Sequence, residues 1–168
     1  MRKILSVAAA GLLLLGVSFQ ASAIEDPDPV GSITANAYLG FLPGTGANAS
    51  IDYVLVNSWW KGHFTIGAYT GFYSGNKTFE SFPKSSFSIM PRATYGLNIT
   101  DSFEAHAGAM SGFRAYKNSE DKNKTGFAFA YVMGCRYFVT DNLGFSAETG
   151  IGLDGFTTYL NIGVSYRF

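Results

Sequence analysis

Two side chains with complementary chemistry stand close together in the second half of this chain. Glu104 and His106 are separated by one residue, and two further charged residues, Arg136 and Glu148, occur in the next apolar segments. A carboxylate beside an imidazole can transfer a proton or bind a metal ion, whereas a carboxylate beside a guanidinium forms a charge-assisted hydrogen bond. Which chemistry applies depends on how many such groups converge and on the elements that position them.

A catalytic or metal centre needs more groups than the sequence places together. The chain has two histidines, His63 and His106, and a single cysteine, Cys135. Zinc sites use three or four converging ligands, and no such set is visible. Residues 44–49 match the pattern G-x-G-x-x-A, but an alternating segment follows instead of a helix, so we interpret them as a turn. The sequence therefore predicts no catalytic residue, no metal ligand and no cofactor.

The elements that must position these residues are visible at the C-terminus. Every second residue there is apolar: Leu160, Ile162, Val164, Tyr166 and Phe168. The residues between them are Asn161, Gly163, Ser165 and Arg167. Because successive side chains of a strand point to opposite faces, this pattern predicts a two-faced β-strand that runs to the last residue.

The same alternation recurs along the chain and defines eight candidate strands. They cover roughly residues 31–41, 49–59, 63–73, 87–99, 103–116, 127–139, 143–153 and 156–168. Four connections are short, including the last one near Asp154 and Gly155, and three are longer, namely 43–48, 74–86 and 117–126. This asymmetry is typical of transmembrane β-barrels. Pro91 cannot donate to a β-ladder, so it is expected to mark a bulge or the level at which regular pairing starts.

The charged residues fall on only one face of these candidate strands. The charges within or at the ends of strands are Asp52, Arg92, Glu104, Arg114, Arg136, Glu148, Asp154 and Arg167. All share the face of the polar residues, and so do both histidines. The opposite face is uncharged, as a lipid-facing surface requires. The sequence therefore predicts an all-β fold, an eight-stranded antiparallel up-and-down transmembrane β-barrel.

With these strands, these turns and the terminal Phe168, the chain resembles small bacterial outer-membrane proteins of the OmpX and OmpA-membrane-domain type. The resemblance implies a monomer in the cell outer membrane, with outer-membrane lipid and lipopolysaccharide as partners. In that family the insertion machinery recognises the C-terminal strand, so Tyr166 and Phe168 are expected to form the insertion signal. The family also implies structural, adhesive, defensive or lipid-related roles, with a surface ligand that the sequence does not identify.

The first 23 residues have the composition of a secretory signal peptide. Arg2 and Lys3 precede an apolar stretch from Ile4 to Val17, and Ala21-Ser22-Ala23 supplies a small-residue cleavage pattern. Residues 1–23 are therefore expected to be removed, which leaves residues 24–168 as one outer-membrane barrel domain. This remainder carries slightly more acidic than basic residues, so no nucleic acid is expected as a partner.

Counting residues from the turns predicts a charge network in the lumen. It places Arg136 opposite Ser146 and diagonal to Glu148 on one side, and opposite His106 and diagonal to Glu104 on the other. Since buried charges need partners, we interpret Glu104, His106, Arg136 and Glu148 as a structural lumen network. A gating or proton-linked role is the alternative.

The predicted function is a non-enzymatic structural or surface-interaction role through extracellular loops. The interaction candidates lie in two loops: Lys77, Phe79, Glu80, Phe82 and Lys84 in the first, and Glu120, Asp121, Lys122 and Lys124 in the second. A lipid-A-modifying outer-membrane enzyme and a narrow channel are the alternatives. An enzyme that acts from the membrane side needs an outward-facing histidine, and an eight-stranded interior is just wide enough for side chains to fill.

Overall fold

The computed structural model describes residues 28–41, 44–59, 62–75, 83–118, 120, 122–152 and 160–168. These residues form eight strands: β1 (Ile33–Phe41), β2 (Thr45–Trp59), β3 (Gly62–Ser74), β4 (Ser85–Thr100), β5 (Phe103–Lys117), β6 (Asn123–Phe138), β7 (Leu143–Gly152) and β8 (Leu160–Arg167). The predicted signal peptide, residues 1–23, lies outside the described residues. Within the described part of the chain, no helix is long and apolar enough to cross a membrane.

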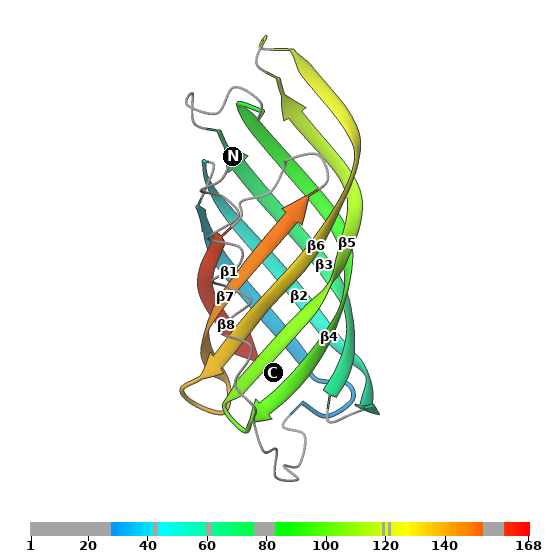
Figure 1. Ribbon diagram of the computed structural model, residues 1–168, viewed down its shortest axis with the longest axis vertical. Helices are drawn as coiled ribbons and strands as arrows, with labels where there is room; N and C mark the ends of the chain where they lie inside the picture. Colours follow the sequence, from blue (N-terminus) through cyan, green and yellow to red (C-terminus); the bar gives the residue numbers. More distant parts are fainter. Residues whose placement is uncertain are drawn as a thin grey trace, which may run out of the picture.

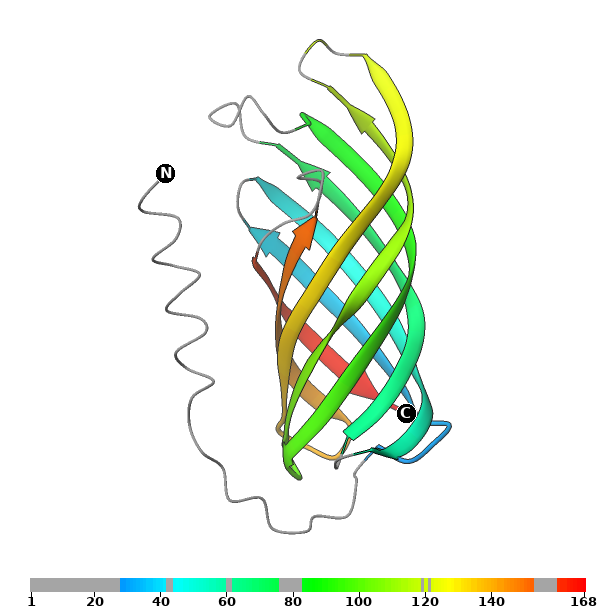
Figure 2. The ribbon, with the colours of Figure 1, turned by 45° about the vertical axis from the view of Figure 1, so that its right-hand side comes forward.

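The strands close into a barrel in sequence order. Each strand pairs antiparallel with the next, and β1 also pairs with β8. The seam between β1 and β8 is continued by the last residue, because the Phe168 amide donates to the Ile33 carbonyl at 2.9 Å. The strands wind around one axis with a strong tilt (Figures 1 and 2). The predicted eight-stranded antiparallel barrel is therefore confirmed.

The two ends of the barrel differ. One end carries the connections β2–β3, β4–β5 and β6–β7 together with the C-terminus (Figure 2). We call this the short-turn end, and the other the loop end. At the loop end, β5 and β6 project beyond the other strands (Figure 1). The β1–β2 connection at the loop end spans only residues 42–44, so the prediction of a longer loop over 43–48 was wrong.

Side chains alternate between the lumen and the outer surface. In β8, Leu160, Ile162, Val164 and Tyr166 are 40–52% exposed, whereas Asn161, Ser165 and Arg167 are at most 8% exposed. The charged residues predicted to face inward are buried as well: Asp52, Arg92, Glu104, Arg114, Arg136, Glu148 and Arg167. Asp154 lies outside the described residues. A polar interior inside an apolar outer surface is the arrangement of a membrane barrel.

Two strands begin four residues earlier than the alternation of apolar residues predicted. β2 starts at Thr45, because residues 45–48 pair with both β1 and β3. β6 starts at Asn123, where it pairs with Lys117 of β5. Lys124, predicted as a loop residue, therefore lies in a strand. The ladder continues past the apolar band, so the loss of apolar alternation does not mark the end of the strand.

Pro91 lies inside β4 and does not mark a bulge. It stands opposite Ala68 of β3. On the β5 side the partners Ile89–Phe113 and Arg92–Met110 keep the same register on either side of it. Met90 and Pro91 are therefore not paired with β5, and the ladder continues in the same register on both sides of them without an extra residue.

The lumen is filled by two kinds of side chain. An apolar cluster comprises Tyr69, Met90, Met110, Ala128, Ala130 and Val132, each at most 4% exposed. The Tyr69 hydroxyl donates to Asn48 Oδ1 at 2.8 Å, which satisfies its polar end. Charged and amide groups fill the part of the lumen nearer the short-turn end.

Candidate functional site

Arg136 is the most connected of the charged residues in the lumen. It is 1% exposed, and its guanidinium donates to three side chains. Nη1 donates to Glu104 Oε1 at 2.8 Å, Nη2 to Asp52 Oδ2 at 2.8 Å and Nε to Asn36 Oδ1 at 3.2 Å. These acceptors come from β5, β2 and β1, so one side chain ties together distant walls of the barrel.

Arg92 forms the second positive centre. Its Nη2 donates to Glu148 Oε2 at 2.9 Å, and its Nε lies 3.0 Å from Asp52 Oδ1. Asp52 therefore binds one guanidinium with each of its oxygens. The Asp52 carboxylate thus lies between the two guanidiniums, and its negative charge offsets their mutual repulsion.

His106 closes the arrangement into a ring. Its Nε2 lies 3.3 Å from Glu148 Oε2, and its Nδ1 lies 3.4 Å from Glu104 Oε1. The contacts thus run through six side chains and return to the first: Glu104, Arg136, Asp52, Arg92, Glu148 and His106. We call this set the lumen ring. All six members are at most 3% exposed, so the ring is a buried network in which each charge has partners of opposite sign.

Asn36 connects the lumen ring to the seam of the barrel. Its amide nitrogen donates to Ser50 Oγ at 3.0 Å and to Asp52 Oδ2 at 3.1 Å. Its oxygen accepts from Arg136 and, at 2.6 Å, from Ser165 of β8. One amide on β1 therefore contacts groups on β2, β6 and β8.

The structure brings the four predicted network residues together, but with different pairings. Arg136 stands directly opposite Glu104, and His106 stands opposite Gly134. The predicted β5–β6 register was therefore wrong by two residues, a slip that preserves the face on which each side chain lies. The predicted Arg136–Ser146 pair is observed. Glu148 pairs with Arg92 and His106 instead of Arg136.

Sequence reasoning missed Asp52, Arg92 and Asn36 as members of this network. Their parity placed Asp52 and Arg92 on the inner face, which was the available signal. The ion pairs of Asp52 with Arg92 and Arg136, and of Arg92 with Glu148, join strands that are not neighbours in the sheet. Such contacts across the lumen depend on the shear and tilt of the closed barrel, which residue counting from turns does not provide.

A second group of charges lies at the short-turn end. Arg167 Nε is 2.6 Å from Asp28 Oδ1, and its Nη2 donates to Asp28 Oδ2 at 3.1 Å. The same guanidinium stacks over the Phe138 ring at 3.8 Å. Asp28 lies before β1, outside the alternating segments of the sequence, yet it is 1% exposed.

The loop candidates lie at the opposite end of the barrel. Lys84 and Lys124 are exposed, and Lys122 forms a solvent-exposed ion pair with Glu120 at 3.0 Å. Such a pair contributes little to stability. Lys77, Phe79, Glu80, Phe82 and Asp121 lie outside the described residues.

A groove lies beside these lysines at the loop end, on β3 to β6. Its volume is about 430 Å³, and its lining includes Phe72, Phe87, Tyr116, Lys117 and Lys124. Arg114 stacks over the ring of Tyr116 at 4.2 Å. The groove therefore combines aromatic rings with ammonium groups at the boundary of the apolar surface.

The predicted insertion signal lies on the outer face beside the seam. Tyr166 is 44% and Phe168 70% exposed. The two rings form an edge-to-face contact with centroids 4.8 Å apart. These side chains are therefore accessible from outside the barrel.

Comparison with known proteins supports the fold. No family model and no curated protein sequence matches the chain. Among solved structures, the N-terminal β-barrel domain of Pseudomonas aeruginosa OprF matches with a TM-score of 0.59 and 14% identity, over 82% of this chain and 98% of that domain. Neisserial surface protein A matches with a TM-score of 0.52 and 16% identity, over 81% and 92% of the two chains.

Yersinia pestis Ail, an outer-membrane protein studied in phospholipid bilayer nanodiscs, matches with a TM-score of 0.52 and 16% identity, over 82% of this chain and 98% of Ail. At such low identities the likeness concerns the fold alone. The chain has the fold of the small eight-stranded outer-membrane β-barrels.

Proposed function

We propose that residues 24–168, after cleavage of the signal peptide 1–23, form a non-enzymatic barrel in the cell outer membrane with a structural or surface-interaction role. The observation that carries the proposal is the closed lumen ring inside an apolar outer surface. The ring occupies the lumen with side chains that are already paired, while the outer surface is suited to lipid. The activity of such a protein then lies in its exposed ends and its surface.

A narrow channel fits the lumen poorly. Arg136 and Asp52 meet across the interior at 2.8 Å, and the apolar cluster around Met90 fills the adjoining part of the lumen. An ion would have to separate buried ion pairs to pass. We therefore expect no steady conductance in planar bilayers.

A lipid-A-modifying enzyme is also disfavoured by the positions of the histidines. His63 and His106 are 2% and 3% exposed, and both face the lumen. His106 is held between two carboxylates of the lumen ring. An imidazole in this position cannot act on an acyl chain that reaches the barrel from the membrane.

The groove at the loop end supports a surface-interaction role. Lys117 and Lys124 supply positive charge, and the exposed rings of Phe72 and Phe87 supply apolar surface beside it. Lipopolysaccharide combines phosphate groups with acyl chains, and ammonium groups bind phosphate. We propose lipopolysaccharide as the partner of this groove.

The test compares three properties of cells and purified protein. Lipid A mass spectra with and without the protein should be identical, and bilayers containing it should show no steady conductance. Lipopolysaccharide should bind the detergent-solubilised protein more weakly after Lys117→Ala/Lys124→Ala than after the control substitution Lys122→Ala. A new lipid A species would contradict this proposal and favour the lipid-A-modifying enzyme. A reproducible conductance would contradict it and favour the narrow channel.

A further inference from the structure

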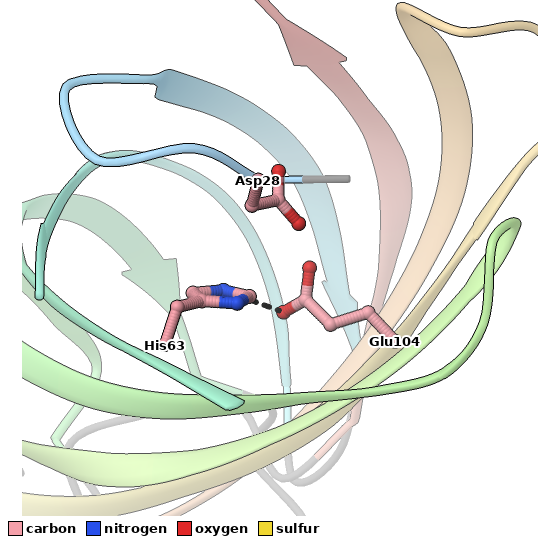
Figure 3. Close-up of side chains that lie close together, drawn as sticks. All are labelled: Asp28, His63 and Glu104. Carbon is pink, nitrogen blue, oxygen red and sulfur yellow. Dashed lines mark ion pairs between the residues drawn. The ribbon is translucent and has the colours of Figure 1, made fainter. Parts of the chain in front are cut away.

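Three side chains able to bind a metal ion converge at the short-turn end of the barrel. They are Asp28 from the segment before β1, His63 from β3 and Glu104 from β5. One ligand atom of each lies within 4.8 Å of the other two. Figure 3 shows the imidazole and the two carboxylates pointing toward one another, with His63 Nε2 4.0 Å from Glu104 Oε1. All three residues are at most 2% exposed.

The types of ligand select the class of metal. Mg²⁺ and Ca²⁺ take oxygen ligands, whereas an imidazole nitrogen combined with carboxylate oxygens suits zinc and related transition-metal cations. Three protein ligands leave room for water to complete the coordination. The expectation that no such set converges was wrong in its geometry, because Asp28, which lies before the first strand, is brought close to His63 and Glu104.

The separations are compatible with one shared cation after a small contraction. Zinc lies about 2.0–2.2 Å from nitrogen and oxygen ligands, so two ligands of a tetrahedral zinc stand roughly 3.3–3.5 Å apart. The observed distance of 4.0 Å between His63 Nε2 and Glu104 Oε1 exceeds the range of a hydrogen bond. Drawing the three ligands inward by about 1 Å would therefore complete the site.

The charge balance of the described residues in this region is compatible with a bound cation. The lumen ring and the Asp28–Arg167 pair contain four carboxylates and three guanidiniums. The remaining buried arginine, Arg114, lies ten positions beyond Glu104, about 33 Å along β5. Among the described residues, the one carboxylate charge in excess is balanced by a proton on an imidazole or by a bound cation.

The carboxylates retain the capacity to bind a metal although they already accept hydrogen bonds. A carboxylate offers about four lone-pair positions. Asp28 is oriented by Arg167, and Glu104 by Arg136 and His106. Hydrogen bonds of this kind commonly orient metal ligands from outside the coordination sphere.

We propose that Asp28, His63 and Glu104 bind a divalent transition-metal cation of the zinc type, with water completing its coordination. The cation connects the segment before β1 to β3 and β5, and so holds that segment against the inner wall of the barrel at the short-turn end. Its role is structural, because the site is buried and adjoins the lumen ring.

The experiment measures Zn²⁺ binding to the exported chain, purified without an affinity tag and freed of metal by a chelator. Calorimetric titration in detergent should show one Zn²⁺ per chain. His63→Ala and Asp28→Asn should each weaken binding by at least about tenfold, as loss of a direct ligand exceeds loss of an outer hydrogen bond. Tyr69→Phe, which changes a lumen side chain outside both the proposed site and the lumen ring, is the control and should bind one Zn²⁺ as the parent does.

A second measurement covers variants that fold poorly. Zn²⁺ should raise the urea midpoint of the parent protein, since a ligand that binds only the folded state stabilises it. It should not raise the midpoint of His63→Gln. No binding to the parent at about 1 mM Zn²⁺ would overturn the proposal. Equal binding by the parent, His63→Ala and Asp28→Asn would do the same.

Discussion

Arg136 of β6 donates to Asp52 of β2 at 2.8 Å, although three strands separate them in either direction around the barrel. The two residues therefore meet across the lumen and connect opposite walls. The outer surface contacts lipid in a membrane barrel, so the interior holds the side chains that fix one wall relative to another. In this chain a large part of that interior is ionic.

Replacing Arg136 by alanine should destabilise the barrel strongly. The substitution leaves Glu104 without its guanidinium partner and Asp52 with only one, and removing one partner of a buried pair typically costs about 3–5 kcal/mol. Water entering the lumen would reduce this cost. Urea unfolding of the detergent-solubilised protein measures it.

Lys124→Ala is the control for that experiment. Lys124 is exposed near the start of β6, so its loss should change the unfolding free energy by about 0.5 kcal/mol or less. Equal urea midpoints for the two variants would show that the guanidinium of Arg136 contributes nothing beyond an exposed side chain.

Asp52 should be energetically coupled to both arginines of the lumen ring. Its two oxygens bind Arg92 and Arg136 separately, so Asp52→Asn weakens two contacts at once. In a double-mutant cycle with Arg136→Gln, the two substitutions should be less than additive by about 1–3 kcal/mol. The matched cycle combines Asp52→Asn with Lys122→Ala at the loop end. Additivity in both cycles would argue against a cross-lumen ion pair.

The architecture could be predicted from the sequence because each side chain of a strand points to one of only two faces of the sheet, here the lumen or the outer surface. Parity alone placed Asp52, Glu104 and Arg136 inside and Ile162 outside, and an error of two residues in register left this unchanged. Strand ends were less predictable. At Thr45 and Asn123 the backbone ladder continues where the apolar alternation has stopped.

The pairing inside the lumen could be predicted only in part. Arg136 and Glu104 lie on adjacent strands, so counting from a turn brought them close. The contacts of Asp52 with Arg92 and Arg136 arise from closure of the sheet, and no turn links those strands directly. Asp28 lies before the first strand and follows no alternation, so only the three-dimensional structure places it beside His63.

Gly163 should tolerate a side chain poorly because β8 approaches β1 closely there. A Cβ at this position would collide with the carbonyl oxygen of Ala37 and lie 2.8 Å from Cα of Tyr38. Forcing extra atoms into a packed site typically costs about 1–3 kcal/mol. Gly163→Ala should therefore lower the urea midpoint and slow closure of the barrel during refolding into detergent.

Gly126→Ala is the matched control, since a Cβ there would meet no atom within 4 Å. Its unfolding midpoint should stay close to that of the parent. If Gly163→Ala proved as stable as Gly126→Ala, the seam between β1 and β8 would be looser than the close approach to Ala37 indicates.

Phe168 should matter more for assembly in cells than for the stability of the folded barrel. Its side chain is 70% exposed and contacts Tyr166, while its backbone amide donates to Ile33 across the seam. Phe168→Ala keeps that backbone hydrogen bond and removes only the exposed ring. We therefore expect a small change in urea midpoint but a clear fall in the amount of protein in the outer membrane. Deleting Phe168 should lower the amount at least as much.

Phe127→Ala, which removes a ring that is 65% exposed at the opposite end of the barrel, should leave membrane levels near those of the parent. Quantitative immunoblots of outer-membrane fractions, compared with refolding yields in detergent, separate the two effects. Unchanged membrane levels for both Phe168 variants would remove this residue from the proposed insertion signal.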